Sequence, residues 1–283
     1  MSGRAISGGK SFSVFWLLAV LFALVWLVIT GAPFVFQILT AFKSQGEFIT
    51  GGLFKLPEKF SFANYSLVLK GGFYKYFLNS IMVLAVSLTL LLFFSAFAAY
   101  PLSRMQFKLN KPIYGAIVAA MSIPIHITLI PVFIMTIRLN IYDKASALIG
   151  PNVAINLPMS VFILTAFMQT ISREMEEAAE IDGCGKFAMF FKIIFPLSKS
   201  GLATLAIYNG VVIWNEFVFA MVLTQSQSAR TLPLAIWEYQ GQYAINTPLI
   251  MSLLVLASLP VIFLYIFSQD KLVKGMMAGA VKG

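Results

Sequence analysis

Charged side chains are scarce in this chain, since only 11% of its 283 residues are Asp, Glu, Lys or Arg. Soluble domains carry about 25% charged residues, so this composition excludes an ordinary water-soluble protein. Hydrophobic residues instead make up 59% of the chain. The sequence therefore predicts an integral membrane protein.

Cysteine and histidine are nearly absent, with one residue of each. The single cysteine, Cys184, excludes a disulfide within the chain, and we interpret it as a small packing residue. A membrane-embedded enzyme would need clustered His, Asp or Glu near one face, whereas most carboxylates here lie in loops. We therefore expect neither a catalytic residue nor a metal site.

Carboxylates are also missing from the centres of the apolar stretches. An ion-coupled secondary transporter usually binds its coupling ion at the bilayer centre, where helices are broken in two related halves. The two halves of this chain show no such repeat. An ion-coupled transporter is therefore only a remote alternative.

Long apolar stretches are what the chain has in abundance. A hydrocarbon core about 30 Å thick needs roughly 20 apolar residues per helix. Six stretches satisfy this requirement, approximately residues 12–36, 76–101, 112–137, 146–171, 200–223 and 248–269. We predict an all-α polytopic membrane protein, a single transmembrane domain over residues 1–283, with the first helix flanking a core of five.

The distribution of Lys and Arg predicts the orientation. Six spans put both termini on one side, and placing them in the cytoplasm collects twelve of the 20 Lys and Arg residues there, together with residues 173–199. The first stretch follows Arg4 and Lys10 but is about twice the length of a signal-peptide core. We therefore expect a retained anchor and two cytoplasmic termini.

Two features at first resemble those of nucleic-acid-binding or nucleotide-binding proteins, but neither indicates such a site. The net charge is +9, but the positive residues are scattered at the ends of the stretches, where lipid headgroups account for them. Gly9, Lys10 and Ser11 resemble the end of a phosphate-binding loop, but the leading glycine, Gly3, is one position too early. We expect no nucleic-acid partner and no ATP site in this chain.

The segment 173–199 carries an ordered pattern between two apolar stretches. Five carboxylates fall within nine positions, followed by a glycine and by apolar residues at helical spacing, which are Phe187, Phe190, Phe191 and Ile194. Pro196 then stands as a stop. The pattern predicts a short helix, a glycine turn and a second amphipathic helix that together dock something in the water phase.

This pattern resembles the EAA loop in the membrane subunits of bacterial ABC importers. The family pattern is Glu-Ala-Ala, three residues, Gly, nine residues, Ile, one residue, Leu-Pro. The matching positions here, with the adjacent Asp182, are Glu177, Ala178, Ala179, Asp182, Gly183, Ile193 and Pro196, while Phe195 stands where the family usually has Leu. The resemblance implies that these residues couple the chain to ATPase subunits.

The resemblance extends over most of the chain, on the motifs Asn64-Tyr65, Leu78-Asn79-Ser80, Tyr100-Pro101-Leu102, Trp214-Asn215-Glu216-Phe217 and the tail 275–283. These motifs are similar to those of MalG-like subunits, which belong to the carbohydrate branch of the ABC importers. The resemblance implies a type I importer (MetI-like) permease fold in a prokaryotic cytoplasmic membrane. It further implies a non-identical MalF-like permease, two ATPase subunits that bind ATP and Mg²⁺, an extracytoplasmic solute-binding protein and a sugar substrate. Glycerol phosphates, transported by the same branch, are the alternative substrate.

Polar residues inside the stretches are candidates for the translocation path, namely His126, Asn156, Asn209, Asn215 and Glu216. Glu216 lies roughly 24 Å from the inner end of its helix, in the outer half. His126 lies between two prolines, where broken helices free carbonyls for partners. Such groups bind sugar hydroxyls and equally hold helices together, and both readings stay open.

Overall fold

The computed structural model describes residues 14–52, 55–239 and 246–280, and all regular structure in these residues is helical. The α-helices are α1 (Val14–Ala41), α2 (Gln45–Gly51), α3 (Ala63–Val68), α4 (Tyr74–Arg104), α5 (Asn110–Ala120), α6 (Ile125–Arg138), α7 (Ile149–Gln169), α8 (Glu174–Ile181), α9 (Lys186–Met189), α10 (Phe195–Leu197), α11 (Lys199–Trp214), α12 (Val218–Leu223) and α13 (Thr247–Ala280). Two π-helical turns, η1 (Leu69–Phe73) and η3 (Phe190–Ile194), and two 3₁₀ helices, η2 (Ala145–Leu148) and η4 (Leu232–Tyr239), complete the set in the described residues.

Four helical stretches of the described chain are long and apolar enough to cross a membrane, Val14–Ala41, Ala63–Arg104, Ala145–Gln169 and Thr247–Phe267. Two bent pairs raise the number to six if each pair is one span. One pair is α5 with α6, and the other is the segment Lys186–Leu197 with α11. The chain is thus a multi-pass membrane protein, and the predicted all-α fold is confirmed.

The predicted stretch 112–137 is not one helix. The structure divides it into α5 and α6, which meet at an angle of 95°. Pro124 precedes α6 in an extended conformation (φ −64°, ψ 133°), and a proline cannot donate the backbone hydrogen bond that would continue α5. Pro131, the second expected break, lies inside α6 without ending it.

The predicted stretch 200–223 is also interrupted. Its first part, α11, has 16 residues and is about 24 Å long, too short to cross a hydrocarbon core of about 30 Å by itself. The chain leaves helical geometry at Asn215–Phe217 and resumes as α12. The two helices together, with the break between them, account for this stretch.

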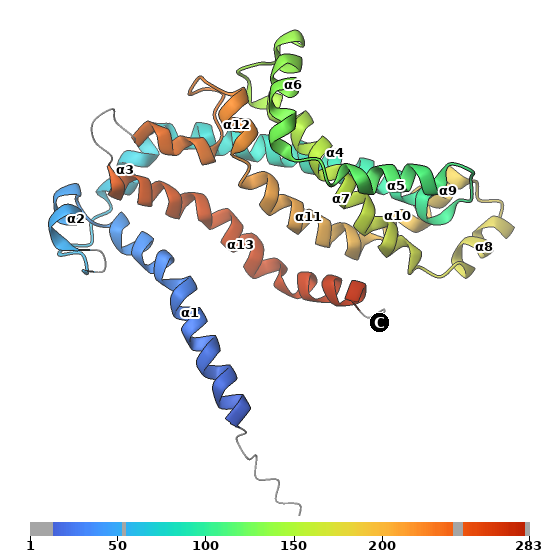
Figure 1. Ribbon diagram of the computed structural model, residues 1–283, viewed down its shortest axis with the longest axis horizontal. Helices are drawn as coiled ribbons and strands as arrows, with labels where there is room; N and C mark the ends of the chain where they lie inside the picture. The colour runs from blue at the N-terminus through green and yellow to red at the C-terminus, as the bar shows by residue number, and fades with distance from the viewer. Residues whose placement is uncertain (1–13, 53–54, 240–245, 281–283) are drawn as a thin grey trace, which may run out of the picture.

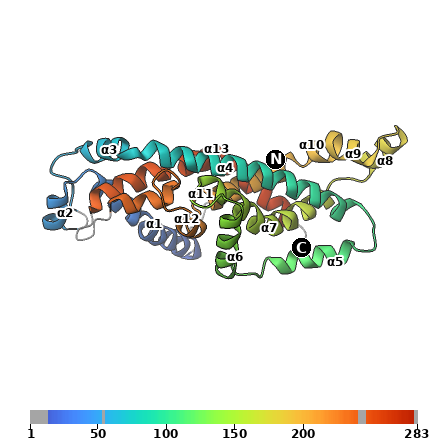
Figure 2. The same cartoon turned by 90° about the horizontal axis from the view of Figure 1, so that it is seen from above.

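Figure 1 shows an elongated bundle in which α4 runs along the long axis beside α7. Both views place α2 and α3 at one extreme of this axis and α8, α9 and α10 at the other, and we name these the α3 end and the α8 end (Figures 1 and 2). The links on either side of α4 therefore lie at opposite ends of the molecule, as expected for a helix that crosses a membrane.

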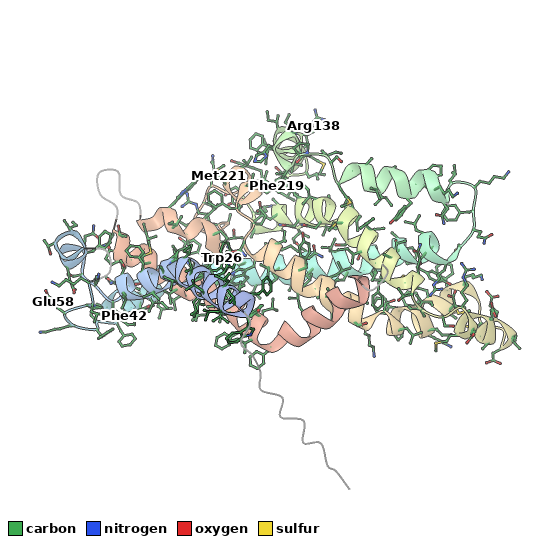
Figure 3. The ribbon with its side chains drawn as sticks, turned by 60° about the horizontal axis from the view of Figure 1, so that its bottom comes forward. Trp26, Phe42, Glu58, Arg138, Phe219 and Met221 are labelled. Carbon is green, nitrogen blue, oxygen red and sulfur yellow. The ribbon has the colours of Figure 1, made fainter. Side chains whose placement is uncertain are left out.

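The first helix stands apart from this bundle. It packs against α13 and then diverges from the other helices (Figure 1). None of its most apolar 18-residue window is buried, and Trp26, labelled in Figure 3, is 59% exposed. An apolar helix so exposed must be covered by lipid or by another subunit, which agrees with the expected flanking helix.

The α8 end has its own buried core, which fixes residues 173–199 to the bundle. It gathers small and aromatic residues of α4, two residues of α7, one of α11 and the inward face of α8–α10, namely Ala96, Ala99, Tyr100, Leu164, Met168, Ala179, Met189, Phe190, Ile194 and Leu205. Burial of this apolar surface is what holds the segment in place.

Candidate functional site

The segment 173–199 folds as a helix, a glycine turn and a second helix, which confirms that prediction. Three glutamates lie in the first turn of α8, where a helix favours negative charge. Gly183 then adopts φ +77°, and the amide of Cys184 donates to the carbonyl of Ala179 at 2.9 Å. Glycine reaches this left-handed conformation without steric cost, so it ends α8 and reverses the chain.

The second helix is amphipathic, but its geometry differs from the simple expectation. Phe190 and Ile194 are buried, whereas Phe187 and Phe191 are exposed. Phe190 contacts the ring of Tyr100 on α4, with 5.3 Å between ring centroids. The π-helical turn η3 precedes Pro196, and the helix ends one residue later at Leu197 before a bend of 68° into α11. Pro196 therefore predicts the end of the second helix to within one residue.

The five carboxylates of α8 and of Asp182, which follows it, divide into two groups. Glu176 pairs with Arg104 of α4 at 3.0 Å, and Glu180 pairs with Lys186 of α9. The hydrogen bond from Lys186 to Glu180 is the main reason that the pKa of Lys186 lies above its usual 10.5. The remaining three, Glu174, Glu177 and Asp182, are exposed and form no salt bridge within the part of the chain that the structure describes.

A groove of about 470 Å³ lies between α8 and the second helix. Its lining residues are Glu174, Met175, Ala178, Lys192, Ile193, Pro196 and Leu197. Ala178, Ile193 and Pro196 were predicted to belong to the coupling surface, so the structure brings three distant motif positions to one apolar groove with charged edges. Such a surface suits an apolar protein segment with charges of both signs beside it.

The other predicted coupling residues have different positions. Ala179 faces inward and is only 9% exposed, so it packs the segment onto the bundle and is not part of its outer surface. Glu177 and Asp182 are exposed, and Gly183 forms the turn. Ala179 therefore supports the segment from its inward face, and the coupling role of the seven residues stays a prediction.

Two of the path candidates, the half-buried Asn156 and the buried Asn209, lie on a polar seam between α7 and α11. The side chains of Asn152, Asn156 and Ser160 each donate to the carbonyl four residues earlier along α7. Asn209 of α11 is fully buried and donates to the Ser160 hydroxyl at 3.0 Å. The amide of Asn209 thus joins two helices inside the subunit, and the structure does not place it on an open surface.

Glu216 lies in the break between α11 and α12 and caps α12. Its two carboxylate oxygens accept hydrogen bonds from the amides of Phe219 at 2.6 Å and Ala220 at 3.1 Å. The carboxylate satisfies amides that have no partner within the helix. It also lines a small cavity of about 10 Å³ with Ser80, Asn152 and Thr231. This geometry supports a structural role for Glu216, which stabilises the start of α12.

Asn215 and His126 lie elsewhere. Asn215 is exposed and lines a hollow of about 480 Å³, together with Gln37 of α1 and Ser258 of α13. His126 lies in the first turn of α6, exposed on the helix that projects from the bundle (Figure 1). The five candidates are thus spread over four places, of which only the hollow at Asn215 is both open and partly polar.

Sequence reasoning missed several residues that fix this architecture. Asn79 donates to two carbonyls, those of Ser228 at 2.8 Å and Arg230 at 2.9 Å. Asp143 accepts from the amides of Gln225 and Ser226 at 2.7 and 2.8 Å. Asn79 had a signal, since it belongs to one of the motifs of the resemblance, whereas nothing in the sequence pairs Asp143 with a turn more than 80 residues away.

Comparison with known proteins agrees with this architecture. The family described as "Binding-protein-dependent transport system inner membrane component" matches residues 91–278. A chain of Caldicellulosiruptor sp. (strain Rt8B.4), named as an ABC transporter permease protein, ORF2, is 49% identical over 263 residues, 93% of this chain and 96% of its own. The melibiose/raffinose/stachyose import permease protein MelC of Bacillus subtilis (strain 168) is 33% identical over 276 residues, 97% of this chain and 98% of its own.

Solved structures share the fold. A chain of a bacterial ABC transporter involved in the import of the acidic polysaccharide alginate superposes with a TM-score of 0.80 at 20% identity. The superposition covers 95% of this chain and 99% of that chain. The fold of nearly the whole chain is therefore a known arrangement.

Proposed function

The chain belongs to the family of binding-protein-dependent transport system inner membrane components, the permeases of ABC importers, and on that premise we propose that it forms half of the translocation path of an ATP-driven oligosaccharide importer. The support for a sugar is the 33% identity, over nearly the whole of both chains, to an import permease for melibiose, raffinose and stachyose. Oligosaccharides carry many hydroxyl groups, and the hollow at Asn215 offers amide and hydroxyl groups beside apolar walls.

The observation that carries the coupling role is the groove at the α8 end. Ile193 and Pro196, which follow Ala178 by 15 and 18 residues, line it together with Ala178, and the exposed Glu174 and Lys192 add one charge of each sign. We assign it to an ATPase subunit. Closure of two ATPase subunits on ATP and Mg²⁺ then moves α8–α10 as a lever, and the attached helices rotate between inward-facing and outward-facing states.

The remaining partners follow from the same assignment. Importers of this family work with a solute-binding protein, which delivers the sugar at the α3 end. A MalF-like permease encloses the other half of the path and covers the exposed α1. The α8 end and both termini face the cytoplasm, because the positive residues are more frequent on that side. ATP is hydrolysed by the ATPase subunits, and this chain supplies no catalytic group.

The test is a charged substitution in the groove. Ala178→Glu places a carboxylate in the apolar floor and should weaken co-purification of the ATPase about tenfold or more, since central interface positions carry most of the binding free energy. Ser228→Glu makes a similar change at the α3 end and should leave assembly unchanged. If Ala178→Glu assembled and transported like the unmodified chain, the coupling role of the groove would be refuted.

The substrate class is tested in proteoliposomes that contain the permeases, the ATPase and the binding protein. We expect labelled raffinose or a related oligosaccharide to enter only when ATP is available to the ATPase. Transport of glycerol 3-phosphate in place of oligosaccharides would replace the proposed substrate. Uptake driven by an ion gradient without ATP would contradict the importer assignment as a whole.

A further inference from the structure

Arg104, the last residue of α4, makes an unusual set of contacts at the α8 end. One guanidinium nitrogen, Nη1, pairs with the carboxylate of Glu176 on α8 at 3.0 Å. The other, Nη2, donates to the carbonyl of Ile171 at 2.7 Å and to the carbonyl of Met168. The side chain is 3% exposed. One buried side chain of α4 thus holds both the end of α7 and the start of α8.

The guanidinium group suits these three acceptors. Met168 lies in the last turn of α7 and Ile171 just beyond it, where the Met168 carbonyl accepts only from amides of the closing turn and the helix dipole favours a positive charge. A planar guanidinium presents several donors in a fixed fork, whereas the ammonium of lysine is a single compact point charge. The site therefore selects arginine by geometry as well as by charge.

Besides the apolar contacts of Ala179 in the buried core, a short stretch of backbone connects α8 to the membrane helices. Residues 170–173 join the end of α7 to α8, and they lie outside regular helix. The other ion pair of the segment, Glu180 with Lys186, is exposed and stays within the segment, since α8 and α9 supply its two partners. Of the salt bridges in the described residues, only that of Arg104 with Glu176 connects α8 to a membrane-crossing helix.

From this geometry we propose that Arg104 is a positioning residue for energy coupling, which makes α8 move as one body with α4 and α7. The proposal rests on the proposed function of the groove. When the ATPase displaces α8, the buried contacts of Arg104 transmit the displacement to two membrane helices. Without them, the link 170–173 absorbs part of the displacement, and ATP is hydrolysed with less sugar transported.

The experiment measures sugar transported per ATP hydrolysed, in reconstituted complexes normalised to assembled protein. For Arg104→Gln we expect this ratio to fall roughly two- to thirtyfold, the range for substitutions along a coupling network, while the ATPase still co-purifies. Arg104→Lys should restore part of the loss. Lys108→Gln removes a positive charge from an exposed position four residues away and should leave the ratio unchanged.

A second readout reports the position of α8 directly. Spin labels at Ile181 of α8 and at Leu109, both strongly exposed, are introduced in a Cys184→Ser chain. The distance distribution between them should be narrow in the unmodified chain and broad in Arg104→Gln. If Arg104→Gln fails to assemble, Arg104→Lys and the milder Glu176→Gln replace it, and both should broaden the distribution and lower the ratio.

The outcomes separate this proposal from the one on which it rests. An unchanged ratio and an unchanged distance distribution in the Arg104 variants overturn the role of Arg104. If Ala178→Glu abolishes assembly in the same preparations, the groove remains the proposed ATPase site even when the Arg104 variants have no effect. If Ala178→Glu has no effect, the coupling assignment of the segment is wrong, whatever the Arg104 variants show.

Discussion

The two ends of the bundle are held together by different chemistry. At the α3 end, polar side chains bind single backbone carbonyls of the connecting segments: Asn79 binds those of residues 228 and 230, Asn64 those of residues 41 and 43, and the buried Lys43 that of Gly52. At the α8 end, the buried and charged Arg104 binds two carbonyls and a carboxylate on a separate helix.

This difference matches different demands on the two ends. Hydrogen bonds from amides to carbonyls fix a loop in one place at a modest free-energy gain of about 1 kcal/mol each. A buried ion pair has strict geometry, and the loss of one partner leaves an unpaired charge that costs about 3–5 kcal/mol. Hydrogen bonds thus fix several separate loops at the α3 end, whereas one buried arginine connects three helices in a defined geometry at the α8 end.

The largest effect is expected from Gly183→Val at the α8 end. Valine at φ +77° is strained because its branched side chain meets the backbone, so the groove should be misplaced and uptake lost while the chain still inserts. The measurement is uptake together with substrate-stimulated ATP hydrolysis.

Gly185→Val is the matched control for that substitution. Gly185 has φ −70°, which every L-residue adopts, and a Cβ at this position would meet no atom within 4 Å. Transport should be near normal. If Gly183→Val took up substrate as fast as the unmodified chain, the turn would not be needed for coupling.

A second prediction compares tight and open packing along α11. A Cβ at Gly201 would lie 2.8 Å from the ring of Phe167 on α7, whereas at Gly210 it would meet no atom within 4 Å. Gly201→Ala should lower the free energy of unfolding by about 1–3 kcal/mol through overpacking. Gly210→Ala should be neutral or raise it by up to about 1 kcal/mol through helix propensity. Thermal unfolding in detergent measures both, and equal effects would contradict the close contact near the α8 end.

The α3 end is tested by Asn79→Ala. Two carbonyls of the 228–230 loop lose their partner, and we expect the free energy of unfolding to fall by about 1–2 kcal/mol, with earlier proteolysis of that loop. Asn215→Ala removes an amide that bonds to the carbonyl of Val211 in its own helix and should cost less. ATPase co-purification should be unchanged in both variants; its loss in Asn79→Ala would mean that the two ends are not independent.

The smallest effect concerns the pH dependence of the turn that follows α12. Partial burial raises the pKa of Asp143, but the hydrogen bonds from Ser226 and Gln225 and the nearby Arg230 together lower it below its usual 3.8. Since the folded-state pKa is depressed, the stabilisation is complete above about pH 4 and is lost as the pH falls through the lower folded value. Asp143→Asn should remove this part of the acid dependence of unfolding, and an unchanged acid profile would contradict the prediction.

Local patterns made much of this architecture predictable. Apolar length predicted the four stretches that fold as single long helices, and the glycine after a run of carboxylates predicted the turn at Gly183, because both depend on residues close in sequence. The partners across helices were not predictable. Arg104 was counted only as a positive charge at the end of a stretch, and the inward orientation of Ala179 depends on where α4 and α7 pass.

The break between α5 and α6 was predicted in part. Pro124 supplied the signal, but Pro131 supplied the same signal and lies inside α6. A proline early in a helix fits where the preceding amides are already unpaired, and one in the interior is tolerated in membranes when neighbouring groups replace the lost hydrogen bond. Sequence alone does not distinguish these situations.

The central claim, that the α8 end and not the α3 end receives the ATPase, is tested most directly by labelling with a membrane-impermeant maleimide. Ala178→Cys and Ser228→Cys are each introduced in a Cys184→Ser chain and labelled with and without the ATPase. We expect the ATPase to protect position 178 and to leave labelling at position 228 unchanged. Equal labelling of position 178 in both conditions would contradict the account.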